Sequence, residues 1–224
     1  MSQTRPTRTP VSLALTGAQR GVYYAHHVAA SDSAGSAAGR FNVGQYVDLA
    51  GGVDSARLRA ALEHAVAETD TLRILIRGGG TAAPDGGEEP YQVVHPELPW
   101  DAPLLEEADL RGADDPRGAA LALMRADMAA PADLAAGPLH RFVLYRIGPR
   151  HLLWYQRFHH IVADAYAITT FTRRVAEVYT SLAEGRTPER RFGDLSAVVA
   201  EEEDYAASDR RTADRGYWSG LLAD

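Results

Sequence analysis

The sequence contains no cysteine among its 224 residues. This absence excludes disulfide bonds, thiolate nucleophiles and cysteine metal ligands, and it fits a cytoplasmic protein. The sequence also lacks an apolar run long enough to cross a membrane or to form a signal peptide. We therefore expect a cytoplasmic protein that does not engage a membrane.

Positive charge is scarce as well. Lysine and arginine together number 23 against 30 aspartates and glutamates, which gives a net charge of −7. Without a basic stripe, a nucleic-acid partner is not expected. Hydrophobic residues make up 46% of the chain and charged residues 24%, as in ordinary globular proteins. The length allows one large domain or two small ones.

The most informative stretch covers residues 151–172, HLLWYQRFHHIVADAYAITTFT. Its first half is apolar and aromatic, which predicts a buried strand. Asp164 stands at the N-cap position of a following helix, whose apolar residues recur at helical spacing. Two adjacent histidines, His159 and His160, lie between the strand and the helix. We expect the chemistry of the protein at this turn.

An imidazole near neutrality can accept and return a proton, for example from an incoming amine or hydroxyl. Because adjacent strand residues point to opposite faces, only one histidine can face a given cleft. His160 is the better candidate, and His159 would support the turn. Asp164 would cap the helix or pair with an arginine. Two adjacent histidines and one carboxylate are poorly spaced for one ion, so no metal is expected.

The remaining pattern predicts alternating helices and strands. Thr16 and Gln19 fit a capping box, and the histidine pair His26-His27 in the same helix is interpreted as structural. Residues 1–14 are expected to be an extended lead-in, 78–89 a glycine-rich hairpin tip and 100–110 irregular. We expect helices over 16–29, 54–68, 114–129, 164–183, 192–208 and in the last residues, and strands over 41–49, 71–77, 91–95, 139–147 and 151–158.

Adjacent pairs of strands favour an α/β fold, a two-layer open sandwich with a mixed sheet. The absence of a strict β-α-β-α rhythm argues against a doubly wound nucleotide-binding fold.

The segment from His159 to Ala165 resembles the HHxxxDG signature of chloramphenicol-acetyltransferase-like acyltransferases, and specifically of condensation domains from nonribosomal peptide synthetases. Three further segments resemble motifs of this family in the expected order: LTGAQRGVY at 15–23, DTLR at 70–73 and YWSGL at 217–221. In the residues around these motifs, the chain most resembles the condensation domain of the serine-activating enterobactin synthetase component, which accepts an aryl starter. Four ordered motifs make the resemblance specific.

The resemblance implies a chloramphenicol-acetyltransferase-like fold in which residues 15–224 form the N-terminal lobe of a two-lobed domain, with the second lobe absent. It implies amide-bond formation between an acyl thioester on a donor carrier protein and an aminoacyl thioester on an acceptor carrier protein. No cofactor would bind directly, because both substrates are attached to the phosphopantetheine arms of the carrier proteins. Further partners would be the C-terminal lobe and a downstream adenylation domain, and the isolated lobe would be inactive.

By the same resemblance His160 is catalytic, as general base or as the group that positions the amine, while His159 and Asp164 maintain the turn. Ala165 and Tyr166 would contact the substrate. The family has glycine where this chain has Ala165. Its methyl group would narrow the pantetheine channel or disturb a glycine-only backbone conformation.

Other interpretations of the function remain open. Another acyltransferase of the superfamily, or an epimerisation domain, shares the histidine pair. A heterocyclisation domain is disfavoured, because it would carry aspartate in place of His159. The chain could also be a non-catalytic lobe that docks carrier proteins or serves as a scaffold.

Overall fold

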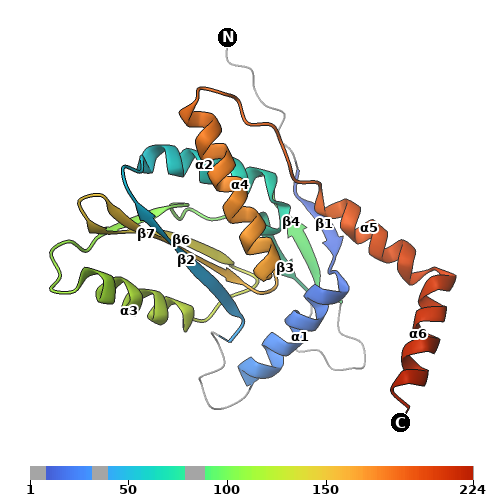
Figure 1. The fold of residues 1–224 in the computed structure, drawn as a ribbon. Helices are drawn as coiled ribbons and strands as arrows, with labels where there is room; N and C mark the ends of the chain where they lie inside the picture. Colours follow the sequence, from blue (N-terminus) through green and yellow to red (C-terminus); the bar gives the residue numbers. More distant parts are fainter. Residues whose placement is uncertain (1–8, 32–39, 79–88, 224) are drawn as a thin grey trace.

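A computed structural model describes residues 9–31, 40–78 and 89–223. Its larger sheet has four strands in the order β2 (Asn42–Ala50), β7 (His151–His159), β6 (His140–Gly148) and β5 (Glu106–Asp109) (Figure 1). β5 runs parallel to β6, whereas the other neighbours are antiparallel. The sheet is therefore mixed, and the expected α/β class and the β6–β7 hairpin are confirmed.

A second sheet has three antiparallel strands in the order β1 (Val11–Ala14), β4 (Tyr91–Val94) and β3 (Ile74–Arg77). The pairing of β3 with β4 follows the predicted hairpin, whose tip lies mostly outside the described residues, as do residues 1–8 of the predicted lead-in. The last residues of that lead-in form β1, a strand that the sequence did not indicate.

The helices begin and end close to the predicted positions. α2 starts after Asp54, whose carboxylate accepts a hydrogen bond from the backbone N–H of Arg57 at 3.0 Å, and α3 starts at Pro116 after the capping Asp115. These caps are strong sequence signals. The helices are α1 (Gly17–Ser31), α2 (Ser55–Glu68), α3 (Pro116–Met128), α4 (Ala165–Ala183), α5 (Leu195–Ala206) and α6 (Asp209–Leu221).

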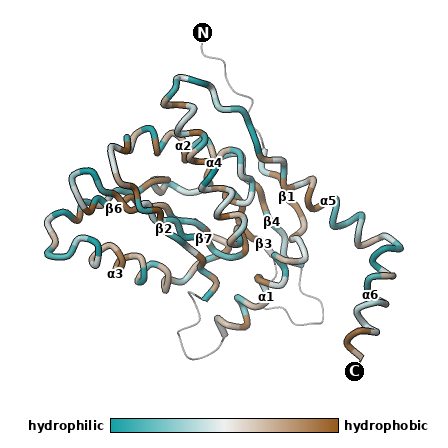
Figure 2. The backbone as a smooth tube through the Cα atoms, in the orientation of Figure 1, coloured by the Kyte–Doolittle hydropathy of each residue, from teal (hydrophilic) through white to brown (hydrophobic). Residues whose placement is uncertain are grey.

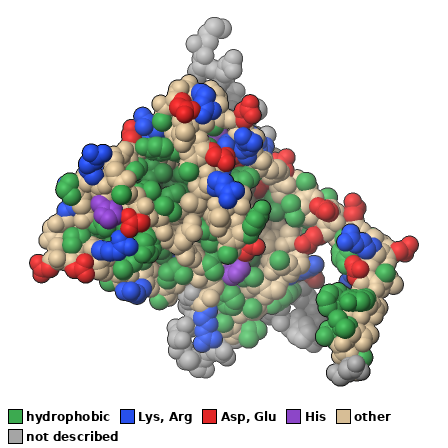
Figure 3. Space-filling view, viewed as in Figure 1, with side chains coloured by type: hydrophobic (Ala, Val, Ile, Leu, Met, Phe, Trp, Pro, Cys, Tyr) green, Lys and Arg blue, Asp and Glu red, His purple; other side chains and the backbone are tan. Residues whose placement is uncertain are grey.

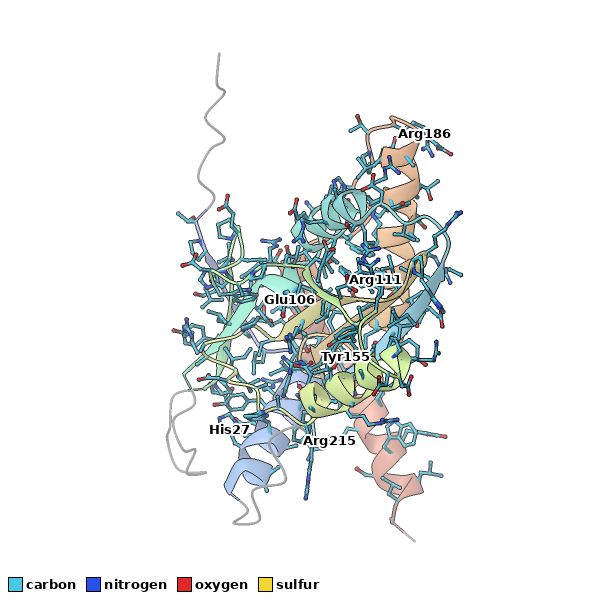
Figure 4. All side chains as sticks on the ribbon, turned by 90° about the vertical axis from the view of Figure 1, so that its left-hand side faces the viewer. His27, Glu106, Arg111, Tyr155, Arg186 and Arg215 are labelled. Carbon is cyan, nitrogen blue, oxygen red and sulfur yellow. The ribbon has the colours of Figure 1, made fainter. Side chains whose placement is uncertain are left out.

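The four-stranded sheet is covered on both faces. Leu152, Trp154 and Phe158 of β7 join the core formed with α2 and α4, while Leu153 and Tyr155 pack with α3 on the other side. This follows from the two-residue period of a strand. Figure 4 labels Tyr155 beside α3. Helix α3 thus adds a third layer to the predicted two-layer arrangement.

Two predicted boundaries were wrong. The strand expected over 71–77 begins as a 3₁₀ helix, Asp70–Arg73, and only Ile74–Arg77 is a strand. The segment 100–110, expected to be irregular, contains β5. The sequence of β5 is EEAD, which has no hydrophobic alternation, so its pairing with β6 decides its conformation.

Arg73, in the DTLR motif, is a buried structural residue. Its guanidinium donates to the carbonyl oxygens of Val66 and His95 and, at 2.7 Å, to the carboxylate of Asp70. Asp70 in turn accepts the backbone N–H of Leu195 at 2.9 Å. One arginine thus joins the end of α2, the smaller sheet and the start of α5.

A second buried charge pair joins α2 to α4. Arg174 donates to both carboxylate oxygens of Glu68, at 2.9 and 2.6 Å, and His64 lies 2.7 Å from the same carboxylate. Burial, the largest single effect, raises the pKa of Glu68. The hydrogen bonds from Arg174 and from the backbone N–H of Arg191, together with the charges of Arg174 and His64, outweigh it, so the net shift is downward. Glu68 is therefore held as a carboxylate.

We predict that Glu68→Gln lowers the free energy of unfolding by about 3 kcal/mol, because it leaves the buried Arg174 guanidinium with only the exposed Glu177 as a counter-charge. Urea denaturation measures the loss. The control is Glu184→Gln, which breaks the exposed pair with Arg186 and should cost less than about 1 kcal/mol. Equal losses in the two variants would contradict a special role of the buried pair.

Candidate active site

The two adjacent histidines separate at the end of β7, one into the protein and one to its surface. His159 is 1% exposed, whereas His160 is exposed. The backbone N–H of His159 donates to the carbonyl of Leu139 at 2.8 Å, and that of His160 to the carbonyl of Phe41 at 2.7 Å. The turn is thus held from both neighbouring segments, and the predicted alternation of the histidines is confirmed.

Both ring nitrogens of His159 have partners. Nδ1 accepts the backbone N–H of Ile161 at 3.2 Å, and Nε2 lies 3.2 Å from Nδ1 of His26 on α1. Burial lowers the pKa of His159 to about 3, helped by the neighbouring His26, His160 and Arg157. The ring is therefore neutral at physiological pH and acts as a fixed part of the turn.

His160 lies on the turn that follows. This turn is closed by the backbone N–H of Val162, which donates to the carbonyl of His159 at 3.0 Å. The exposed imidazole of His160 can meet a substrate from solvent, and its free electron pair can accept a proton from an amine or hydroxyl. Of the two histidines, only His160 is placed for such a contact.

Asp164 caps α4, as one of the two sequence interpretations proposed. Its Oδ1 accepts the backbone N–H of Ala167 at 2.8 Å. Among the described residues, no arginine forms an ion pair with this exposed carboxylate. The side chain therefore sets where α4 begins, directly after the histidine turn.

Ala165 and Tyr166, the expected substrate-contacting residues, open α4 and are exposed, Tyr166 to 81%. No non-glycine residue in the described part of the chain has a positive φ. Ala165 therefore lies in an ordinary helical conformation at the start of α4, which alanine accepts. The effect of its methyl group on a channel stays a prediction.

The predicted capping box tethers α1 to the histidine turn. Thr16 and Gln19 exchange hydrogen bonds of 3.0 and 3.2 Å, which confirms the box. The side-chain nitrogen Nε2 of Gln19 also donates to Oε1 of the buried Gln92 at 2.9 Å and to the backbone carbonyl of Ile161 at 3.4 Å. The opening LTGAQ segment therefore supports the HHIVADA segment directly.

His26 is a residue of the site that the sequence did not indicate. The sequence indicates a structural role for it, because it lies within a predicted helix and has no nearby carboxylate. The structure places it against His159, with Phe41 completing a cluster of three rings whose centroids lie 5.1 to 6.0 Å apart. A contact across 133 residues leaves no local signal, so the sequence alone could not have revealed it.

The described residues contain neither a metal-binding cluster nor a membrane-spanning helix. Within 9–31, 40–78 and 89–223, no group of three or more histidine, aspartate or glutamate side chains is arranged to hold a metal ion. None of the helices in these ranges is both long and apolar enough to span a bilayer.

Helix α6 carries an exposed apolar surface. None of its residues is buried, and in Figure 1 it projects from the rest of the fold. Its last turn is hydrophobic in Figure 2, and Figure 3 shows hydrophobic side chains gathered there. The exposed apolar residues are Tyr217, Trp218, Leu221 and Leu222. Such a patch marks a contact surface.

Comparison with known proteins gives consistent matches. The family model "Condensation domain" matches residues 11–224. Isonitrile lipopeptide synthase of Streptomyces coeruleorubidus is 41% identical over 82% of this chain and 12% of its own length. Enterobactin synthase component F of Escherichia coli K12 is 34% identical over 92% of this chain and 15% of its own.

A solved structure, the starter condensation domain of rhizomide synthetase, superimposes with a TM-score of 0.81 at 31% identity. The match covers 96% of this chain and 48% of that structure. The chain thus spans about half the length of that solved structure and a smaller part of the two synthases.

We predict that Asp164→Ala lowers the free energy of unfolding by about 1 kcal/mol, because α4 loses its cap, whereas Asp164→Asn stays within about 0.5 kcal/mol of wild type. Asp115→Ala, which removes the corresponding cap of α3, is the matched comparison. Urea denaturation of the variants checks this. If asparagine were as damaging as alanine, the charge of Asp164 would matter more than its capping bond.

We also predict a loss of stability in acid. Folding holds the pKa of His159 at about 3, against about 6.5 in an unfolded chain. Between these two pH values the His159 side chain is protonated in the unfolded state and neutral in the folded state. Its contribution to the free energy of unfolding therefore falls as pH decreases from about 6.5, by about 1.4 kcal/mol per pH unit.

His159→Asn removes this titration while its side-chain oxygen can still accept the N–H of Ile161. We therefore expect the free energy of unfolding of the variant to depend less steeply on pH, by up to about 1.4 kcal/mol per pH unit, which corresponds to one proton. Urea denaturation at a series of pH values measures this slope. The buried His140, whose pKa is lowered to about 4 by burial, provides a comparison through His140→Gln. A slope unchanged in His159→Asn would contradict the prediction.

Proposed function

The chain belongs to the condensation domain family of nonribosomal peptide synthetases, and we propose that residues 15–224 are the N-terminal lobe of a two-lobed domain that forms amide bonds. The observation that carries this proposal is the exposed imidazole of His160, presented by a turn whose backbone is bonded on both sides. The match of the family model over residues 11–224 supports the assignment.

In the proposed reaction, the amine of an aminoacyl thioester attacks the carbonyl carbon of an acyl thioester. A C–N bond forms, the C–S bond breaks, and the sulfur of the donor arm leaves as a thiolate, which takes up the proton that the amine has lost. His160 accepts the proton of the attacking amine or orients the amine for attack. His159 and Asp164 keep the turn in place, and Ala165 and Tyr166 contact the substrate at the start of α4.

Both substrates arrive on the phosphopantetheine arms of carrier protein domains, one donor and one acceptor. Tethering two reactants in one site raises their effective concentration, and this supplies much of the rate. The donor is an acyl or aryl starter, an assignment supported by the likeness to a starter condensation domain and to enterobactin synthase component F.

The second lobe and a downstream adenylation domain complete the working assembly. The match covers 48% of that solved domain, which supports the assignment of residues 15–224 to one of two lobes. The exposed apolar residues of α6 fit a contact with further parts of such an assembly. We place the reaction in the cytoplasm, which suits a chain without cysteine. Alone, the lobe is expected to be inactive, because it lacks the opposite wall of the site.

The test is amide formation by a two-lobed domain that contains this lobe, supplied with loaded donor and acceptor carriers. His160→Ala should lower the rate by at least about 100-fold, as removal of an acid–base group does. The control is His151→Ala, at the other end of β7, where the imidazole contacts Asp48 on the surface. This variant should retain activity.

Carrier binding distinguishes the catalytic proposal from the alternative of a docking or scaffold lobe. If His160→Ala bound the carriers and formed product at the wild-type rate, the lobe would be a docking or scaffold element, and the catalytic proposal would fail.

A further inference from the structure

The contacts of His26 and His159 define which ring nitrogen of each histidine carries the proton. Nδ1 of His159 accepts the backbone N–H of Ile161, so in the neutral ring the proton sits on Nε2. That Nε2–H faces Nδ1 of His26 at 3.2 Å. A hydrogen bond forms there only if Nδ1 of His26 is unprotonated, which leaves the proton of His26 on its own Nε2. The order of donors is therefore Ile161, His159, His26.

The charged neighbours of both rings favour this neutral arrangement. Burial lowers the pKa of His26, as does the adjacent His27, while Asp133 acts in the opposite direction. Burial lowers the pKa of His159 most, and the charges of His26, His160 and Arg157 lower it further. Protonation of His26 at Nδ1 would bring two N–H groups face to face and break the contact.

The same arrangement governs the peptide groups on either side of His160. Its own N–H is bonded to the carbonyl of Phe41, and the next N–H, that of Ile161, is bonded to the ring of His159. The His159 ring is in turn oriented by His26 from α1. A rotated or tautomerised His159 would release the Ile161 peptide and tilt the imidazole of His160.

Resting on the proposed function of His160, we propose that His26 is a positioning residue for the reaction, which selects the tautomer of His159 and thereby holds His160 in its reactive orientation. His26 touches neither substrate nor the reacting atoms in this scheme. Its effect passes through one hydrogen bond to His159, and a small displacement of a reactive group changes activity measurably.

The first measurement is independent of activity. Histidine-selective ¹⁵N labelling and a long-range ¹H–¹⁵N correlation spectrum at neutral pH report which nitrogen of each ring bears the proton. In the wild-type chain, both His159 and His26 should be protonated at Nε2. His26→Leu should change the His159 signals. Protonation of His159 at Nδ1 in the wild type would overturn the inference, whatever the outcome for His160→Ala.

The second measurement uses amide formation in the two-lobed domain. His26→Leu should lower kcat about tenfold, the equivalent of one lost hydrogen bond, with KM for the donor within about twofold. His26→Asn places an amide oxygen near the position of Nδ1 and should restore kcat to within about twofold of wild type.

The control is His151→Leu. His151 lies at the other end of β7, where its imidazole contacts Asp48 on the surface. Its kcat should stay within about twofold of wild type. Equal losses in His26→Leu and His26→Asn would show that shape, and not the accepting nitrogen, matters, and would reject the proposal. Because the spectrum is read separately, a failure of the proposed function and a failure of this inference give different results.

Discussion

The burial of strand β7 is the constraint on which the site depends. Every residue from Leu152 to His159 is buried, between β2 and β6 at its edges and between helices on its faces. A shift of one residue in its register would move each side chain to the opposite face. The hydrophobic core thereby decides that His159 points inward and His160 outward, although neither histidine contributes much to that core.

The turn beyond the strand is held by groups that come from distant parts of the chain. Gln19 bonds the carbonyl of Ile161, Phe41 accepts the N–H of His160, and Leu139 accepts that of His159. Each bond places one peptide of the turn, and the bonds come from α1, the start of β2 and the segment before β6. The orientation of the His160 imidazole is thus a property of the assembled fold, and the proposed transfer reaction requires such fixed geometry.

Local signals were sufficient where a feature depends on neighbouring residues. Asp54, Asp115 and Asp164 each predicted the start of a helix, because an N-cap satisfies N–H groups only a few residues away. They were insufficient for β1 and β5, whose four residues each become strands only by pairing with β4 and β6. The roles of Arg73 and Arg174 were likewise hidden, since both act on carbonyls or carboxylates of other elements.

The sequence by itself determined the helices, the β6–β7 hairpin, the opposite facing of the two histidines, and the family motifs, because capping, two-residue alternation and motif order are properties of nearby residues. Only the tertiary structure decided that His26 meets His159, that Gln19 reaches Ile161 and that α3 covers a second face of the sheet. These contacts join residues far apart in the chain, and they form only when the packing of the core has brought their elements together.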